Sequence, residues 1–139
     1  MKTILTYLKE SLHKPAEIFI IIKPGFFQYT QDILNHFAED GWKILKQRSK
    51  KLLLKESQRL YKIHKNEDFY EDLCKYMSSD ITTAFILRND NKEMSNEIFE
   101  ETSALKDKIR EMYGESDMRN VIHSSDSLEH MIKEKSIYF

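Results

Sequence analysis

An uninterrupted run of apolar residues near the start of the chain constrains the fold more than any other segment. Residues 17–22 read Glu-Ile-Phe-Ile-Ile-Ile, with β-branched and aromatic side chains and almost no polar alternation. A strand with one face in water alternates apolar and polar residues, whereas a strand covered on both faces does not. We therefore expect a strand over residues 17–22 that is buried on both faces.

The segments on either side limit the length of this strand. Pro15 separates it from residues 1–14, where charged residues alternate with leucine and isoleucine in the pattern of a short amphipathic helix. Residues 1–14 have neither a continuous apolar core nor a small-residue cleavage site, so we expect no signal peptide and no membrane span. At its other end, Lys23-Pro24-Gly25 is a turn signal that begins with a basic side chain.

Strand and helix patterns alternate along the rest of the chain. We expect the polar run at residues 89–91 to turn the chain, and a charged stretch to lead through Arg110 to Gly114. The order of elements indicates an α+β fold. Helices are predicted at residues 26–40, 55–64, 67–77, 92–101 and 128–135, and strands at residues 42–54, at 80–87 and, briefly, before His123.

Size and charge exclude several classes of protein. The 139 residues, 40% of them hydrophobic, suit one compact domain over residues 1–139. With 22 basic and 23 acidic residues, the net charge is −1, so we expect no broad surface for nucleic acid or an anionic membrane. The basic run at residues 48–51 lacks interleaved aromatic residues and is interpreted as a solvated strand edge. A single cysteine, Cys74, and no zinc-ligand spacing favour a reducing, cytoplasmic location.

The segment Asn-Val-Ile-His-Ser-Ser-Asp-Ser, residues 120–127, brings a histidine to the start of a helix. An apolar pair precedes His123, and the Ser and Asp residues after it can cap the helix at residues 128–135. Backbone N–H groups at a helix N-terminus attract anions such as phosphate. A lone histidine at a strand end is more often a packed or surface residue than a catalyst, so this segment alone leaves both interpretations open.

Residues 120–127 resemble the Asn-hydrophobic-Ile-His-Gly-Ser-Asp-Ser signature of nucleoside diphosphate kinases, whose histidine carries a phosphoryl group between nucleotides. Residues 22–25 are similar to the family's Ile-Lys-Pro-Asp-Gly, and residues 61–77 to its Tyr…Phe-Phe…Lys-Tyr-Met. The resemblance covers residues 17–139, with the motifs in the correct order. It implies a ferredoxin-like β-α-β-β-α-β sandwich, with helices on one face of a four-stranded antiparallel sheet and additional helices.

The resemblance also implies a role for each matching residue. His123 would be the nucleophile, which suits an imidazole because its ordinary pKa of about 6.5 leaves it mostly unprotonated near neutral pH. Glu134 and Ser125 would hold its ring. Tyr61 would support the pocket and Phe69 would stack on the nucleobase. The implied phosphate- and sugar-binding residues are Lys23, Thr102, Arg110 and Asn120.

The same resemblance implies the ligands and the assembly. Nucleoside triphosphates and diphosphates would be the substrates, and Mg²⁺, held mainly through the nucleotide phosphates, would be the cofactor. A homo-oligomer, a dimer or larger, would be the functional form.

The chain departs from the family pattern at several positions. Asn96 occupies the place of a second phosphate-binding arginine, and Ser124 that of the glycine after the histidine. The segment between Thr102 and Arg110 is shorter than in typical members and lacks their Pro and Gly. These departures leave two hypotheses: an active phosphotransferase, or a nucleotide-binding or scaffolding domain that has lost efficient turnover. The cations that could replace the missing arginine are Arg88, Lys92 and Lys106.

Overall fold

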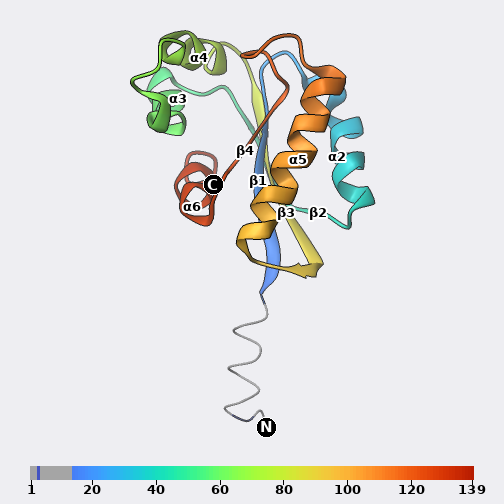
Figure 1. Cartoon of the computed structure of the whole chain (residues 1–139). Coiled ribbons are helices and arrows are strands. Elements are labelled where there is room, and N and C mark those ends of the chain that lie inside the picture. Colours follow the sequence, from blue (N-terminus) through green and yellow to red (C-terminus); the bar gives the residue numbers. More distant parts are fainter. Residues whose placement is uncertain (1–2, 4–13) are drawn as a thin grey trace.

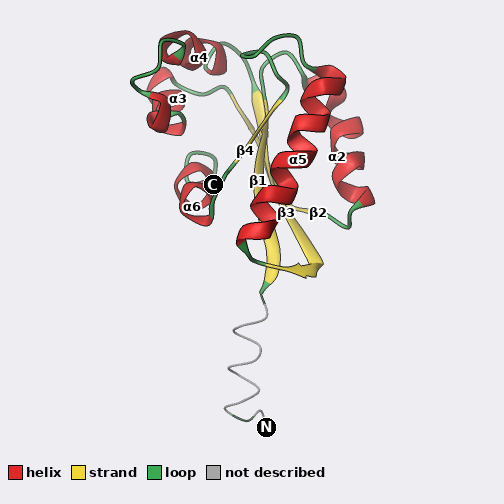
Figure 2. Ribbon diagram, in the orientation of Figure 1, coloured by secondary structure: helices red, strands yellow, loops and turns green. Residues whose placement is uncertain are grey.

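Four strands form one antiparallel sheet in the order β2-β3-β1-β4 (Figures 1 and 2). The computed structural model describes residue 3 and residues 14–139, so the helix predicted over residues 1–14 lies almost wholly outside the described residues. The strand order and the alternation with helices confirm the predicted α+β arrangement. The strands are β1 (Pro15–Ile22), β2 (Lys43–Lys50), β3 (Thr82–Glu93) and β4 (Ile122–Ser124).

Helices cover both faces of the sheet. The helices α2 and α5 pack on one face, and α3, α4 and α6 on the other (Figure 1). The expectation of helices on one face is therefore incomplete, because the additional helices cover the second face. The helical segments are η1 (Phe27–Tyr29), α2 (Thr30–Glu39), α3 (Leu54–Leu60), η2 (Lys62–His64), α4 (Tyr70–Met77), α5 (Asn96–Tyr113) and α6 (Leu128–Lys135).

The central strand β1 contributes to both halves of the core. Ile18, Ile20 and Ile22 join the cluster under α2 and α5, while Phe19 and Ile21 join the cluster under α3, α4 and α6. Each of these five side chains is at most 1% exposed. Because successive side chains of a strand point to opposite faces, a run with no polar residue can be buried only in this way. The predicted burial of this strand on both faces is confirmed.

Strand β3 continues through the polar residues where a turn is predicted. Asn89 is fully buried, yet its amide Nδ2 donates to the carbonyl of Asp40 at 2.8 Å. Its Oδ1 accepts from the backbone N–H of Asn91 at 3.0 Å. Since these bonds satisfy the buried amide, the side chain does not need to reach water and the strand extends to Glu93. The prediction of a turn at residues 89–91 is wrong.

Helix α5 is also longer than predicted. The sequence pattern indicates a helix at residues 92–101 and then a charged stretch, whereas the structure has one helix over Asn96–Tyr113. No Pro or Gly interrupts this segment, and Ile98, Phe99 and Ile109 keep the helix buried on one side. Gly114 ends it. Because α5 is continuous, the position of each of its side chains around and along the helix is fixed.

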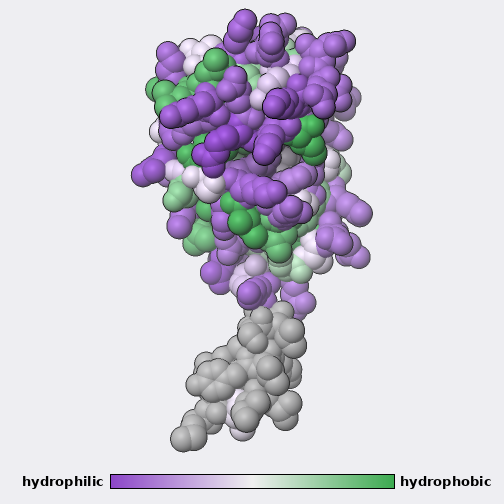
Figure 3. Space-filling model, turned by 90° about the vertical axis from the view of Figure 1, so that its left-hand side faces the viewer, coloured by the Kyte–Doolittle hydropathy of each residue, from purple (hydrophilic) through white to green (hydrophobic). Residues whose placement is uncertain are grey.

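The remaining boundaries differ by a few residues. Strand β2 covers Lys43–Lys50 and is shorter than the predicted 42–54, and Trp42 before it and Leu52 after it are buried. The helix predicted at residues 26–40 divides into η1 and α2, that at 55–64 into α3 and η2, and that at 67–77 begins at Tyr70. No helix of the described part of the chain is long and apolar enough to cross a membrane. Figure 3 shows mainly hydrophilic side chains on the face seen from the left of Figure 1, with smaller hydrophobic areas between them.

Candidate active site

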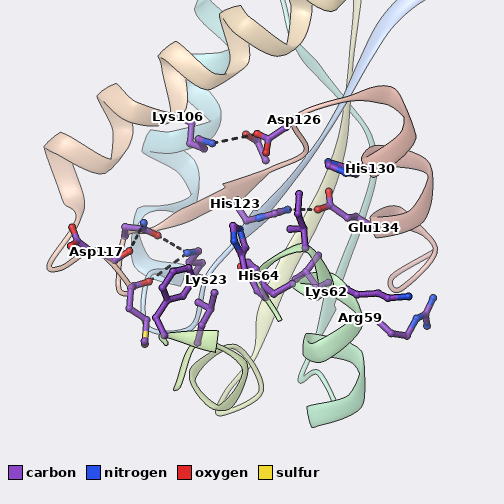
Figure 4. A pocket seen from close by; sticks show the side chains of 18 of the residues that line it. Lys23, Arg59, Lys62, His64, Lys106, Asp117, His123, Asp126, His130 and Glu134 are labelled. Atoms are coloured by element: carbon purple, nitrogen blue, oxygen red, sulfur yellow. Dashed lines mark hydrogen bonds and ion pairs between the residues drawn. The ribbon is translucent and has the colours of Figure 1, made fainter. Parts of the chain in front are cut away.

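A pocket of about 770 Å³ lies between helix α5, strand β4 and the segment from α3 to α4. Figure 4 shows that cationic and histidine side chains reach it from several elements. It brings together most of the residues that the sequence suggests. These are Lys23, Tyr61, Phe69, Arg110, Asn120, His123 and Glu134.

The register of β4 decides which way His123 points. In the antiparallel pairing of β4 with β1, His123 lies opposite Ile21, and Ile122 lies opposite Ile22. Directly opposed residues of two strands point to the same face of the sheet. His123 therefore emerges on the face of Ile21, beneath α3 and α6, while Ile122 is buried on the face of α2 and α5.

A carboxylate holds the imidazole by one nitrogen. Nε2 of His123 lies 3.1 Å from Oε1 of Glu134, and the hydroxyl of Ser125 donates to the other carboxylate oxygen, Oε2. A neutral imidazole that donates from Nε2 to a carboxylate has its lone pair on Nδ1. Among the described residues Nδ1 has no hydrogen-bond partner, so it is the nitrogen available for reaction (Figure 4).

Glu134 is charged in this arrangement. Burial opposes its ionisation, but the hydrogen bonds from His123 and Ser125 outweigh that effect and hold its pKa below the usual value. The side chains of His123 and Glu134 are only 14% and 13% exposed, so water weakens their interaction little. The local sequence positions the carboxylate, since Ser127 caps helix α6 by accepting from the N–H of His130 at 3.2 Å. The predicted cap and helix at 128–135 are confirmed.

A strained turn precedes the histidine. Val121 has φ of 79°, and the N–H of Ile122 donates to the carbonyl of Asn120 at 2.9 Å, which closes a γ-turn around Val121. A positive φ is unusual for a β-branched residue and persists only where the surroundings enforce it. Here Val121 is fully buried, and its carbonyl accepts from the N–H of Lys23 at 2.8 Å.

The turn after β1 presents Lys23 to the pocket. The N–H of Phe26 donates to the carbonyl of Lys23 at 3.2 Å, and Gly25 has φ of 89°, as expected for a type II turn with proline and glycine at its centre. The ammonium Nζ of Lys23 donates to Oδ1 of Asn120 at 2.5 Å and to the carbonyl of Met118 at 3.4 Å. These contacts anchor the side chain at the pocket wall.

Lys23 is nearly buried, with 4% of its surface exposed. Burial, together with the positive charges of Arg110 and Lys106, lowers the pKa of its ammonium to about 7. A bound anion would offset these effects, raise the pKa of Lys23 and so favour the charged lysine. The pocket is therefore suited to bind a negatively charged group.

Arg110 links helix α5 to the strand that carries the histidine. Its guanidinium donates from Nε and Nη2 to the carbonyl of Ile122 at 3.2 and 2.8 Å. The same side chain lines the pocket, so its charge is held beside His123. The predicted proximity of Arg110, Lys23 and His123 is thus present in the structure.

Two aromatic residues complete the wall. The ring of Tyr61 meets that of His123 edge-on, with centroids 5.5 Å apart, and its hydroxyl is the one buried side-chain polar atom among the described residues without a hydrogen-bond partner. Burial raises the pKa of Tyr61, so the hydroxyl stays protonated and can donate. Phe69 is 44% exposed at the pocket and lies against His64, with ring centroids 5.4 Å apart.

Thr102 is the one predicted phosphate-binding residue that the structure moves elsewhere. It lies in the interior of α5, 4% exposed, and its hydroxyl donates to the carbonyl of Ile98 at 2.7 Å. It is not among the pocket residues that the structure describes. Because Thr102 lies inside a continuous helix and not in a loop, the structure does not bring it to the site.

Several pocket residues have no assigned role in the sequence interpretation. Helical spacing could have found His130, which precedes Glu134 by four residues and so shares its helix face. By the same spacing Lys106, already named as one of three candidate cations, shares the helix face of Arg110. The others depend on how distant segments meet. They include Arg59, Lys62, His64, Asp117, Met118, Asp126 and Lys133.

The pocket could accommodate Mg²⁺ only with a bound phosphate. The described residues contain no group of three or more His, Cys, Asp or Glu side chains that could hold a metal ion. The carboxylates of Asp117 and Asp126 line the pocket singly. Mg²⁺ is commonly held by one or two carboxylates, water and substrate phosphates, which is compatible with this donor set.

Comparisons with known proteins point to one family. A family model described as nucleoside diphosphate kinase matches residues 17–139. The protein named nucleoside diphosphate kinase from Kosmotoga olearia is 31% identical over 127 residues, which cover 87% of this chain and 86% of that protein. The protein of the same name from Fervidobacterium nodosum is 32% identical with the same coverage.

Solved structures share the fold. A crystal form of the Aquifex aeolicus nucleoside diphosphate kinase has a TM-score of 0.73 at 23% identity and covers 91% of this chain and 96% of its own. The apo enzyme structure from Encephalitozoon cuniculi has a TM-score of 0.76 at 22% identity and covers 88% of each chain. These likenesses confirm the ferredoxin-like α+β fold.

Proposed function

The chain belongs to the nucleoside diphosphate kinase family, and we propose that His123 carries the phosphoryl group from a nucleoside triphosphate to a nucleoside diphosphate. The phosphotransferase activity follows from the family, whereas the roles of individual residues are our proposal. The observation that carries it is the geometry of one imidazole. Its Nε2 is bound to a largely buried carboxylate and its Nδ1 is left without a partner in the described part of the chain.

The reaction needs two in-line transfers. In the first, the lone pair of Nδ1 attacks the γ-phosphorus, the bond from that phosphorus to the bridging oxygen breaks, and the nucleoside diphosphate leaves with the electron pair. In the second, a terminal oxygen of another diphosphate attacks the phosphohistidine, and the P–N bond breaks. Glu134 accepts from Nε2–H throughout and stabilises the positive charge that develops on the ring.

Cationic and polar side chains would meet the charge on the phosphates. Lys23 and Arg110 lie at the pocket wall near His123, and Asn120 accepts from the ammonium of Lys23. The protein contributes to such a transfer mainly by positioning the reactants and by stabilising the charge of the transition state. Bound Mg²⁺ would add charge neutralisation on the phosphate oxygens. The unpartnered hydroxyl of Tyr61 can donate to a phosphoryl oxygen, which would give this buried group its missing hydrogen bond.

Phe69 would hold the nucleobase. Its ring is partly exposed at the pocket, and His64 supports it from one side. Stacking requires only the face of a base, so a platform of this kind accepts several bases.

A homo-oligomer is part of the same proposal. Strand β2 is the edge of the sheet and is exposed over almost its whole length, including Ile44 at 48% and Leu45 at 45%. An edge strand with unpaired backbone groups and exposed apolar residues favours association. Light scattering coupled to size exclusion would give the subunit number, and a strictly monomeric protein would contradict this part. A cytoplasmic location is proposed with it, in keeping with the free thiol of Cys74.

Labelling with γ-³²P ATP tests the catalytic proposal. We expect an acid-labile, alkali-stable phosphate on the protein, chased off by a nucleoside diphosphate, and no label on His123→Ala. His36→Ala is a matched control, because His36 lies on α2 and outside the pocket. Labelling of His123→Ala at the level of the wild type would refute the role of His123. Binding of ADP without any ATP-to-GDP transfer would instead favour the binding-domain hypothesis.

A further inference from the structure

The continuous helix α5 changes which of its residues can reach a nucleotide. Asn96 is its first residue, and Arg110, which lines the pocket, is fourteen residues further on. At 1.5 Å per residue, the two positions lie about 21 Å apart along the helix axis. A cation at position 96 would therefore be separated from Arg110 by most of the helix length, and Asn96 is not among the pocket residues of the described chain.

Lys106 is better placed on the same helix. It precedes Arg110 by four residues, or about 6 Å along the axis, so the two side chains share one face. Both line the pocket, and the side chain of Lys106 is only 12% exposed. In Figure 4 Lys106 enters from the helix, on the side of the pocket opposite η2.

The other two candidate cations are engaged elsewhere. The guanidinium of Arg88 donates to Asp90 at 2.8 Å, on strand β3. The ammonium of Lys92 pairs with Asp40 at 2.9 Å and with Glu101 at 2.8 Å. Neither residue is among the described pocket residues, so Lys106 is the candidate that the fold brings to the site.

The contacts of Lys106 leave its charge available. Among the described residues it pairs with Asp126, whose carboxylate is 4.0 Å away, beyond hydrogen-bond distance, and whose side chain is 71% exposed. Burial and the neighbouring charge of Arg110 lower the pKa of Lys106, as expected for a cation held in a positive site. Its charge also acts on Lys23. An anion bound between these three cations would stabilise all of them.

We propose that the ammonium of Lys106 binds a nucleotide phosphate directly, on the α5 side of the pocket, and so takes the place of the arginine that this chain lacks. This inference rests on the proposed function and names a further phosphate-binding residue of the same site. Binding requires Lys106 to leave Asp126, whose exposed carboxylate can turn to water. The chain has then kept a phosphate-binding cation in spite of the shortened segment after Thr102, because helix α5 supplies Lys106 from the face that lines the pocket.

Equilibrium binding of ADP without metal provides the test, with transfer from ATP to GDP as the second readout. Lys106→Met keeps the aliphatic stem and removes the charge. Losing one charge-assisted hydrogen bond weakens binding about 10- to 150-fold, and we expect a rise of this size in the Kd for ADP and in the KM. Lys106→Arg should restore the Kd to near the wild-type value. Lys108→Met is the matched control, because Lys108 is exposed on the same helix and outside the pocket.

The outcomes separate this inference from the proposed function. A raised Kd in Lys106→Met, rescue by arginine and an unchanged Lys108→Met support it. If the wild type binds ADP and is labelled by ATP while Lys106→Met binds ADP as tightly, the inference is wrong and the proposed function stands. If the wild type neither binds ADP nor is labelled, both are wrong. Melting temperatures of the variants show that any change in binding does not come from unfolding.

Discussion

The lowered pKa of Lys23 predicts that nucleotide binding takes up a proton. With a pKa of about 7 the ammonium is half charged at neutral pH, because it is buried beside Arg110 and Lys106. Bound phosphate favours the charged form and raises the pKa back toward the ordinary value. At pH 8 only about 10% of free Lys23 is charged, so binding should take up about 0.9 proton, and at pH 6 about 0.1.

The affinity should follow the same dependence. Above pH 7 the lysine must first be protonated, so the Kd for ADP should rise about tenfold per pH unit, or about 1.4 kcal/mol, until the pKa of the bound state is reached. Titration calorimetry in two buffers of different ionisation enthalpy measures the number of protons taken up. Lys23→Arg is the comparison, because a guanidinium stays charged throughout this range.

The nucleotide also changes its protonation with pH, but it does so equally in both proteins. The difference in proton uptake between the wild type and Lys23→Arg therefore reports the ionisation of Lys23 alone. We expect proton uptake at pH 8 in the wild type to exceed that in Lys23→Arg by most of one proton. Equal uptake in both proteins, or a Kd that is flat between pH 7 and pH 9 in the wild type, would refute the reasoning. In that case the ammonium would already be charged before the nucleotide arrives.

Three further substitutions test single contacts. Glu134→Gln keeps the shape of the side chain but removes the charge that stabilises the imidazolium. Phosphorylation of His123, measured by rapid quench, should therefore slow about 10- to 150-fold. An unchanged rate would exclude this role of Glu134. Tyr61→Phe removes a buried hydroxyl that has no hydrogen-bond partner among the described residues. It should raise the free energy of unfolding of the nucleotide-free protein, measured with denaturant, by about 1–3 kcal/mol while slowing phosphoryl transfer. A lower free energy of unfolding would contradict this. Thr102→Val should leave the KM for ATP within about twofold, since the lost hydrogen bond is to the neutral carbonyl of Ile98 and not to substrate; a larger rise would restore Thr102 to the site.

Strong local patterns predicted the elements that hold the reactive group. The unbroken apolar run of β1, the turn at Pro24-Gly25 and the serine cap of α6 each depend on residues close in sequence. These elements position Lys23, His123 and Glu134. Their meeting, however, was expected only through the family resemblance, because no local rule pairs β4 with β1.

The failures have a common physical cause. Asn89 looks like a turn residue by itself, and only the distant carbonyl of Asp40 makes it acceptable inside a strand. Thr102 was placed by its match to the family's phosphate-binding threonine, yet no helix-breaking residue interrupts α5, which runs on and buries it. Both outcomes depend on distant contacts or on the full length of a helix, which the few residues around Asn89 or Thr102 do not reveal. For the same reason Lys106 could be named from the sequence as one of several cations but not selected.

The register between β4 and β1 has a consequence for how this site can vary. Only three residues of β4 pair with β1, and the strand follows directly on the turn at Val121. Inserting or deleting a single residue between that turn and His123 would rotate the imidazole to the opposite side of the sheet, into the layer formed by Ile20 and Ile22. The length of this stretch is therefore fixed as firmly as the identity of its histidine, and a chain of altered spacing here would fold with its nucleophile buried on the wrong face of the sheet.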